Sequence, residues 1–469
     1  MKYSYTAIIT ILTIIMALAI LPGSGRVALA GQKVSIDRSE TPTTLDAAED
    51  RDTDTGRLTL DQAKKIALEH NPTLTSAMER ISQAKEAVNQ AKADYLPTIS
   101  VTAGIDYAEE TKNSAAGYNE NNYTNQISAT QVLFNGFYRK YSNLSAQYNE
   151  TMSIIAQDDV KRLLSWSVAQ AFLNTQLAIE NIKVAQADMA FNLEQEIEAA
   201  AKEKSGIGSY SDVLNFKTKV NSAKSSLLSA KQDLNEATHG LAVLLGYENA
   251  CLPEGMNVSE LTLDEQDVII TLETGPEFDS QIKTLVAARP DIKEASIAIQ
   301  DAQANIQMAK SSYFPTISLT GAYGTASGET FYNEESMGAS LGISVSFDIF
   351  SGGATTAEVR QTLAEKREKE SDLLDAKNTA VSNIKISMQK IETAQEQLDL
   401  QTENTRLIEI TRDLVQKEFN AGQASLVRLN EAQTDLVTAQ GNLSLARVSL
   451  ILALEEFDYY IGKNINPVL

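Results

Sequence analysis

The feature that most constrains this chain is an internal repeat, because two copies of one unit are expected to adopt the same fold. The segment YLPTIS at 95–100 recurs as YFPTIS at 313–318, an offset of 218 residues. Farther along the chain, Gly206 recurs as Gly422, an offset of 216 residues. A match that keeps its register over this distance predicts a duplicated unit of roughly 190 residues, and a repeat must be recognised before domains are counted.

The repeat divides the 469 residues into two copies of one unit rather than several unrelated domains. We expect a signal peptide, an acidic leader, the first repeat, a linker, the second repeat and a C-terminal tail, at 1–30, 31–57, 58–246, 247–277, 278–462 and 463–469. Each repeat is expected to contain a helix, two strands, a very long helix, a glycine turn and a return helix. The helices are expected at 59–94, 137–204 and 211–245, and again at 279–312, 354–420 and 426–461.

The return helices carry a heptad pattern of large residues facing small ones. The large residues are Val213, Val220, Leu227, Leu234 and Leu241 in the first copy, and Leu429, Leu436, Leu443 and Leu450 in the second. The small ones include Ala223, Ala230 and Ala237, and Ala432, Ala439, Ala446 and Ala453. This pattern predicts a coiled-coil seam, and a long helix of about 67 residues would span about 100 Å. A spectrin-like or signalling coiled coil has the same pattern, so the helices alone do not decide the class.

The strands decide it. Apolar and polar residues alternate from Thr98 to Tyr107, from Thr316 to Tyr323 and from Gly338 to Ile349, and less cleanly around 125–134. Strict alternation predicts a half-buried sheet, and segments of this length also fit membrane strands with an apolar outer face and a polar lumen. A small soluble sheet under a helical cap is the alternative.

Four strands cannot close a barrel by themselves. An open strand edge is not tolerated in lipid, where each unpaired backbone group costs several kcal/mol. If the strands span a membrane, the chain must therefore oligomerise. Two chains would give eight strands, whose interior is filled by side chains, so a conducting lumen of twelve strands requires three chains.

The first 30 residues are typical of a secretory signal peptide. Lys2 is positive, 6–21 is apolar, and a small-x-small site ends at Ala30. An uncleaved signal anchor is the alternative, and a lipid anchor is not expected because no Cys follows the apolar run. The leader at 31–57 has no apolar period and is expected to be disordered. No later apolar run reaches the roughly 20 residues of a spanning helix, so the destination is the periplasm, the outer membrane or the medium.

Composition excludes several function classes. The net charge is −22, and it becomes about −24 without Lys2 and Arg26, whereas a nucleic-acid-binding protein needs a basic face. A single Cys and two His leave little for a metal site, and no catalytic or nucleotide-binding motif is present. We therefore expect no enzyme, no cofactor, no metal and no nucleic-acid partner.

These residues together resemble the TolC-type outer-membrane efflux proteins, over about 58–462. The markers are the doubled helix-Tyr-x-Pro-x-Ile-strand passage, FNGF at 134–137, FSGG at 350–353, and the paired glycine turns. The resemblance implies a homotrimer with a twelve-strand barrel in the outer membrane and a long helical, coiled-coil barrel crossing the periplasm. It also implies a passive exit duct for an inner-membrane pump or ABC transporter, joined through a periplasmic adaptor, in a tripartite efflux or type I secretion system. The alternative is a periplasmic coiled-coil scaffold or adaptor without a channel.

The resemblance also assigns site residues. The adaptor-docking tips would be the two turns: Gly206, Ile207, Gly208 and Ser209, and Gly422, Gln423, Ala424 and Ser425. The periplasmic constriction would involve Asp212, Arg428, Glu431 and Phe419. Arg428 departs from the acidic residue usual in the family. Two roles stay open for it: pairing with Asp212 or Glu431 of a neighbouring helix to hold the duct closed, or reducing the preference of the duct for cations.

Overall fold

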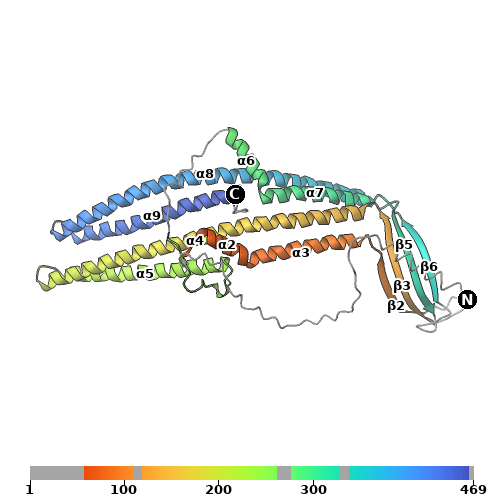
Figure 1. Ribbon diagram of the computed structural model, residues 1–469, viewed down its shortest axis with the longest axis horizontal. Helices are drawn as coiled ribbons and strands as arrows, with labels where there is room; N and C mark the ends of the chain where they lie inside the picture. The colour runs from red at the N-terminus through yellow and green to blue at the C-terminus, as the bar shows by residue number, and fades with distance from the viewer. Residues whose placement is uncertain (1–56, 110–118, 261–275, 328–336, 464–469) are drawn as a thin grey trace. The chain divides into compact units, whose positions relative to one another are not determined.

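The computed structural model describes residues 57–109, 119–260, 276–327 and 337–463. The predicted signal peptide, almost all of the leader and most of the C-terminal tail lie outside the described residues. The described part is mainly helical, with four long strands, as the sequence predicted (Figure 1).

The same order of elements occurs twice along the chain. The first half contains β1 (Arg57–Leu58), α2 (Leu60–His70), α3 (Pro72–Ala93), β2 (Thr98–Glu109), β3 (Asn119–Asn135), α4 (Tyr138–Lys204) and α5 (Tyr210–Leu244). The second half contains α6 (Pro276–Ala288), α7 (Pro290–Ser311), β5 (Thr316–Ser327), β6 (Met337–Ser346), α8 (Ala354–Asn420) and α9 (Leu426–Ile461). Between them lie a short 3₁₀ helix, η1 (Glu248–Ala250), and β4 (Asn257–Val258), which pairs in parallel with β1.

The opening helix of each half is broken, so the prediction of a single helix at 59–94 and at 279–312 is wrong. Asn71 has an extended backbone with ψ of 126° and separates α2 from α3. Arg289, with ψ of 142°, separates α6 from α7. Both residues precede a proline, which disfavours the helical conformation of the residue before it and is itself well suited to the first position of a new helix.

Each half folds its last two helices into an antiparallel pair. We call α4 with α5 the first hairpin and α8 with α9 the second hairpin. The long helices α4 and α8 both have 67 residues, which confirms the predicted lengths. The predicted seam is buried, with Val220, Leu227 and Leu241 in α5 and Leu429, Leu436 and Leu450 in α9. On α8, Ile384 and Ile391 are buried as expected.

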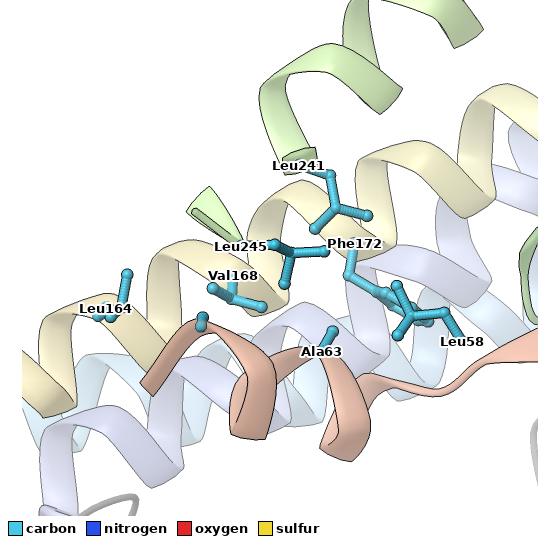
Figure 2. Packing of buried hydrophobic residues seen from close by; sticks show 8 residues of the cluster. Leu58, Ala63, Leu164, Val168, Phe172, Leu241 and Leu245 are labelled. Atoms are coloured by element: carbon cyan, nitrogen blue, oxygen red, sulfur yellow. The ribbon is translucent and has the colours of Figure 1, made fainter. Parts of the chain in front are cut away.

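The largest core cluster described lies where α2 crosses the first hairpin (Figure 2). Leu164, Val168 and Phe172 of α4 meet Leu241 and Leu245 at the end of α5, and the cluster also includes Leu58, Ala63 and Ala67. The capping box of Thr59 and Gln62 fixes the start of α2, since each side chain accepts from the other residue's backbone N–H. This packing holds the bend at Asn71 in place.

By length and composition, α9 is apolar enough to cross a membrane, which the sequence analysis did not expect. Its apolar seam is instead packed on α8, and its end is held by ion pairs. Glu455 pairs with Lys64 of α2 at 2.7 Å, and Glu456 pairs with Lys390 of α8 at 2.8 Å. These contacts are those of a packed coiled-coil helix.

The four long strands form one sheet in the order β2-β3-β5-β6. In the antiparallel pair of β2 and β3, Val101 lies opposite Ile127 and Ser100 lies opposite Ser128, so one face is apolar and the other polar. The two serine hydroxyls lie 2.8 Å apart. On the apolar face Val101 is 71% exposed and Ile343 of β6 is 68% exposed. The chain therefore does not bury the apolar face of these strands, contrary to the alternative of a soluble capped sheet.

Candidate functional site at the hairpin tips

The first tip closes through the backbone of Gly206–Ser209. Gly206 has a φ of +74°, and the N–H groups of Ile207 and Gly208 donate to the carbonyl of Lys202 at 3.1 and 3.0 Å. A left-handed residue at this place lets the last carbonyls of α4 be satisfied. The hydroxyl of Ser209 then accepts from Ser211 N at 3.2 Å and caps α5.

The second tip repeats this geometry. Gly422 also has a φ of +74°, and Gln423 and Ala424 donate their N–H groups to the carbonyl of Glu418. Ser425 caps α9 by accepting from Arg428 N at 3.3 Å. A Cβ added at Gly206 or Gly422 would have nothing within 4 Å, so conformation alone requires glycine at these two positions.

The two tips present different surfaces. Ile207 of the first tip is 80% exposed, and Tyr210, immediately after the cap, is also largely exposed. On the second tip the exposed apolar residue is Val427. Sequence reasoning selected Ile207 but missed Tyr210 and Val427, although their place in the first turn of a capped helix could have identified them. An exposed apolar side chain at the end of a hairpin is suited to contact with another protein.

Beneath the tips, an apolar cluster joins the two hairpins. It contains Phe191, Ala199, Phe216, Val415, Leu429 and Ala432, with Phe419 packed against it. The rings of Phe216 and Phe419 meet edge to face at 6.4 Å, and Lys202 Nζ lies 5.5 Å from the centre of the Phe419 ring. Phe419, one of the predicted constriction residues, is thus held in place by groups from both hairpins.

The predicted constriction charges are only partly brought together within one chain. Asp212 is half-buried and, with Phe419, Lys202 and Ser209, lines a cavity of about 30 Å³. Arg428 pairs with Glu418 of its own hairpin, at 3.8 Å, and both side chains are exposed. Glu418 was not selected from the sequence, because the pair bridges a turn of the chain. Such an exposed pair contributes little to stability, so Arg428 remains available to other partners.

A second group of charges lies at the C-terminal end of α9. Arg162 of α4 is buried, donates to the carbonyl of Tyr459 at 3.1 Å and to Asp159, and lies 4.3 Å from the centre of the Tyr459 ring. Arg289 donates to the carbonyl of Tyr460 at 3.0 Å. These guanidinium groups satisfy carbonyls that would otherwise lack a partner at a helix end.

Two carboxyl groups beside these arginines have shifted pKa values. Burial raises the pKa of Glu294, and the negative charges of Asp159 and Asp291 add to this shift. Burial alone would also raise the pKa of Asp291, but the hydrogen bond and the charge of Arg289 outweigh it and hold that pKa below its usual range. Glu294 is therefore the carboxyl of this group that most favours its protonated form.

Metal-binding chemistry has little to work with in the described part of the chain. Among these residues, no three His, Cys, Asp or Glu side chains lie together in a way that could hold a metal ion. Cys251, in the segment that follows α5, is exposed and has no disulfide partner.

Comparison with known proteins decides the family. The family model described as "Outer membrane efflux protein" matches residues 64–247 and 282–463, which is most of the chain. The chain belongs to this outer membrane efflux protein family. The match confirms the resemblance found in the sequence and the outer-membrane location, and it supports a channel over a scaffold without one. The family consists of outer-membrane channels, not enzymes.

Curated relatives cover most of both chains. The chain is 25% identical over 388 residues to "Cation efflux system protein CusC" of Escherichia coli strain K12, which covers 80% of each chain. It is 25% identical over 413 residues to "Pyoverdine export outer membrane protein OpmQ" of Pseudomonas aeruginosa, covering 84% of each. It is 21% identical over 394 residues to "Outer membrane protein TolC" of Escherichia coli strain K12, covering 81% of this chain and 78% of that one.

Solved structures share the fold. The Campylobacter jejuni CmeC outer membrane channel has a TM-score of 0.74 and 17% identity, covering 87% of each chain. A crystal structure of CusC has a TM-score of 0.72 and 18% identity, covering 87% of this chain and 93% of that one. At these identities the likeness supports the fold alone.

Proposed function

We propose that three copies of this chain form a twelve-strand barrel in the outer membrane that continues into a barrel of helical hairpins. The observation that carries the proposal is the sheet. Its two faces differ in polarity, the apolar face is exposed, and β2 and β6 are the edge strands. Lipid demands that both the apolar face and the edges be covered. Pairing of β2 with β6 of a second copy would remove both edges.

The division into two repeats, at 58–246 and 278–462 with a linker at 247–277, is part of this proposal. Its support is the twofold order of elements, the equal lengths of α4 and α8, and a family match in two segments. Six hairpins, two from each chain, would then surround one duct. The linker and the short tail at 463–469 would lie outside that duct.

The duct would be the passive exit of a tripartite efflux or type I secretion system. A periplasmic adaptor would dock at the tips and connect the trimer to an inner-membrane pump or ABC transporter. In support, relatives carry names from cation efflux and pyoverdine export, and the tips carry exposed Ile207 and Tyr210. Crosslinking from a cysteine placed at Ser205 or Ala421 should capture the adaptor. Crosslinks found only near the strands would contradict docking at the tips.

The constriction would lie just inside the tips, at Asp212, Phe419, Arg428 and Glu431. Asp212 and Phe419 line one cavity, while Arg428 and Glu431 lie one turn apart on α9. In a closed trimer, Arg428 would pair with an acidic residue of a neighbouring helix. The triple variant Asp212→Asn, Arg428→Gln, Glu431→Gln removes these attractions together.

Planar-bilayer recording tests both the channel and the constriction. The unaltered protein should give discrete, small currents that favour cations, because the chain is strongly acidic. The triple variant should give a larger closed-state conductance. A protein that stays monomeric in detergent and forms no channel would sink the proposed duct. Unchanged conductance in a working triple variant would place the constriction elsewhere.

A further inference from the structure

The two hairpins of one chain share an interface whose counterpart is exposed. Along α4–α5 and α8–α9, every residue of the first hairpin has an equivalent 216 positions later, because α4 and α8 have equal lengths and the tip glycines keep this offset. Equivalent residues can therefore be compared directly. Inside the chain, α4 packs against α9, so these two faces are covered (Figure 1).

The face of α9 that meets α4 is buried, whereas the equivalent face of α5 is open. On α9, Ser444 is 6% and Val448 is 1% exposed. Their equivalents on α5 are Leu228, which is 69% exposed, and Gln232, which is also exposed. An exposed leucine in place of a buried serine indicates a surface that is covered in the working assembly.

The long helices differ in the reciprocal way. On α4, Phe191 is 9% exposed in the cluster between the hairpins, and Arg162 is buried against the end of α9. On α8 the equivalent of Phe191 is Leu407, which is 50% exposed, and the equivalent of Arg162 is Asn378, which is exposed. The open face of α8 is thus the counterpart of the face with which α4 holds α9.

We propose that α8 of one chain packs against α5 of the next in the same residue register that joins α4 to α9 within a chain. A second copy is the occupant that the repeat specifies, because each open face is equivalent to one half of an interface that already exists. A contact of this head-to-tail kind generates a ring when its rotation closes. The inference rests on the proposed trimer and adds which faces meet and in which register.

The chemistry of the equivalent pairs fits this register. Within the chain, Gln433 Nε2 donates to Asp188 Oδ1 at 2.9 Å. The equivalent residues are Lys217 of α5 and Asn404 of α8, both exposed, so an ammonium donor would meet an amide carbonyl acceptor. Asn378 would take the place of Arg162 and donate to the carbonyl of Val243, the equivalent of Tyr459.

The apolar positions fit as well. Leu407 would take the place of Phe191, whose cluster includes Leu429 and Ala432 of α9. The equivalents of these two α9 residues in the next chain are Val213 and Phe216 of α5. Leu407 would therefore lose its exposure to water by packing on an apolar part of α5.

Paired cysteines test the register in the full-length protein. Cys251→Ser provides the background, since Cys251 is exposed. Lys217→Cys with Asn404→Cys places one thiol on each proposed partner face. A short bifunctional thiol reagent should then join separate chains into covalent dimers and trimers on a denaturing gel.

Two control pairs frame this experiment. Asp188→Cys with Gln433→Cys should crosslink within one chain and leave the mass of a monomer, since these residues already touch. Lys217→Cys with Arg406→Cys keeps the α5 thiol but moves the α8 thiol to another exposed face of that helix. The proposed pair should give at least about tenfold more interchain product than this off-face pair, because only helix positions three or four apart share a face.

The failures are distinguishable. If the protein is trimeric by native mass but the proposed pair joins no chains, or joins them no better than the off-face pair, the proposed register is wrong and the trimer stands. If the protein is monomeric while the Asp188–Gln433 control still crosslinks, the chain is folded and the proposed trimer itself fails, together with this inference.

Discussion

The sharpest structural prediction concerns Gly246, at the end of α5, and its repeat equivalent Gly462, at the end of α9. Both have left-handed backbones, with φ of +81° and +78°. They differ in what an added methyl group would meet. A Cβ at Gly246 would lie 2.5 Å from the carbonyl oxygen of His70, whereas the nearest atom at Gly462 would be Arg289 Cγ, 3.9 Å away.

The expected loss follows from two separate terms. A side chain in the left-handed region costs about 1–2 kcal/mol, and this applies to both variants. Gly246→Ala also drives a methyl group into a backbone carbonyl that cannot rotate away, and a forced backbone shift of this kind costs about 1–3 kcal/mol. Gly246→Ala should therefore lower the free energy of unfolding by about 2–5 kcal/mol, against about 1–2 kcal/mol for Gly462→Ala.

Denaturant unfolding in detergent, followed by far-ultraviolet circular dichroism, measures the difference. The midpoint should fall farther for Gly246→Ala than for Gly462→Ala, with an unchanged slope, because a change in midpoint at constant slope reports stability. Equal losses in the two variants would show that α5 does not approach His70 as closely as described. A larger loss at Gly462 would refute the reasoning outright.

Three further predictions concern single side chains. Glu294→Gln should remove a pH-dependent loss of stability: the folded-state pKa is raised, so stability is greatest below the usual Glu range of about 4.3 and falls as pH rises through the folded value. Parallel pH titrations of the melting temperature in both proteins would contradict this. Arg162→Met should cost about 1–3 kcal/mol, because the Tyr459 carbonyl loses its buried donor; a melting temperature unchanged from the native protein would count against it. Ser425→Ala should cost about 1 kcal/mol and speed hydrogen exchange at the Arg428 amide, and unchanged exchange would rule out the cap.

The hairpins and strands could be predicted because their signals are continuous. The seven-residue spacing from Val213 to Leu241 extends over the whole of α5, and the alternation around Val101 covers most of β2. The breaks at Asn71 and Arg289 were missed although the prolines that follow were noticed. A proline can begin a helix as readily as it can end one, and the apolar pattern on either side does not change phase visibly.

The site was predictable only where the backbone dictates the residue. A turn that needs a positive φ selects glycine, so Gly206 and Gly422 could be identified from their order alone. The partners of the charged residues could not. Arg428 meets Glu418 across a turn, and Phe419 meets Phe216 of the other hairpin, because contacts between distant segments depend on packing that no local pattern encodes.

The helix ends of the two repeats show which requirement the duplication has retained. In the first half, Asn71 Nδ2 donates to the carbonyl of Leu244 at 2.7 Å. In the second half the equivalent donor is Arg289 and the equivalent acceptor is the carbonyl of Tyr460. A carbonyl at a helix C-terminus needs a donor, but the donor can be an amide or a guanidinium. The arginine adds a charge, and with it the ion pair to Asp291. The requirement of the fold is thus the same in both halves. The second half alone couples it to the charged group around Arg162 and Glu294, which is why pH should act on that half of the molecule more than on the first.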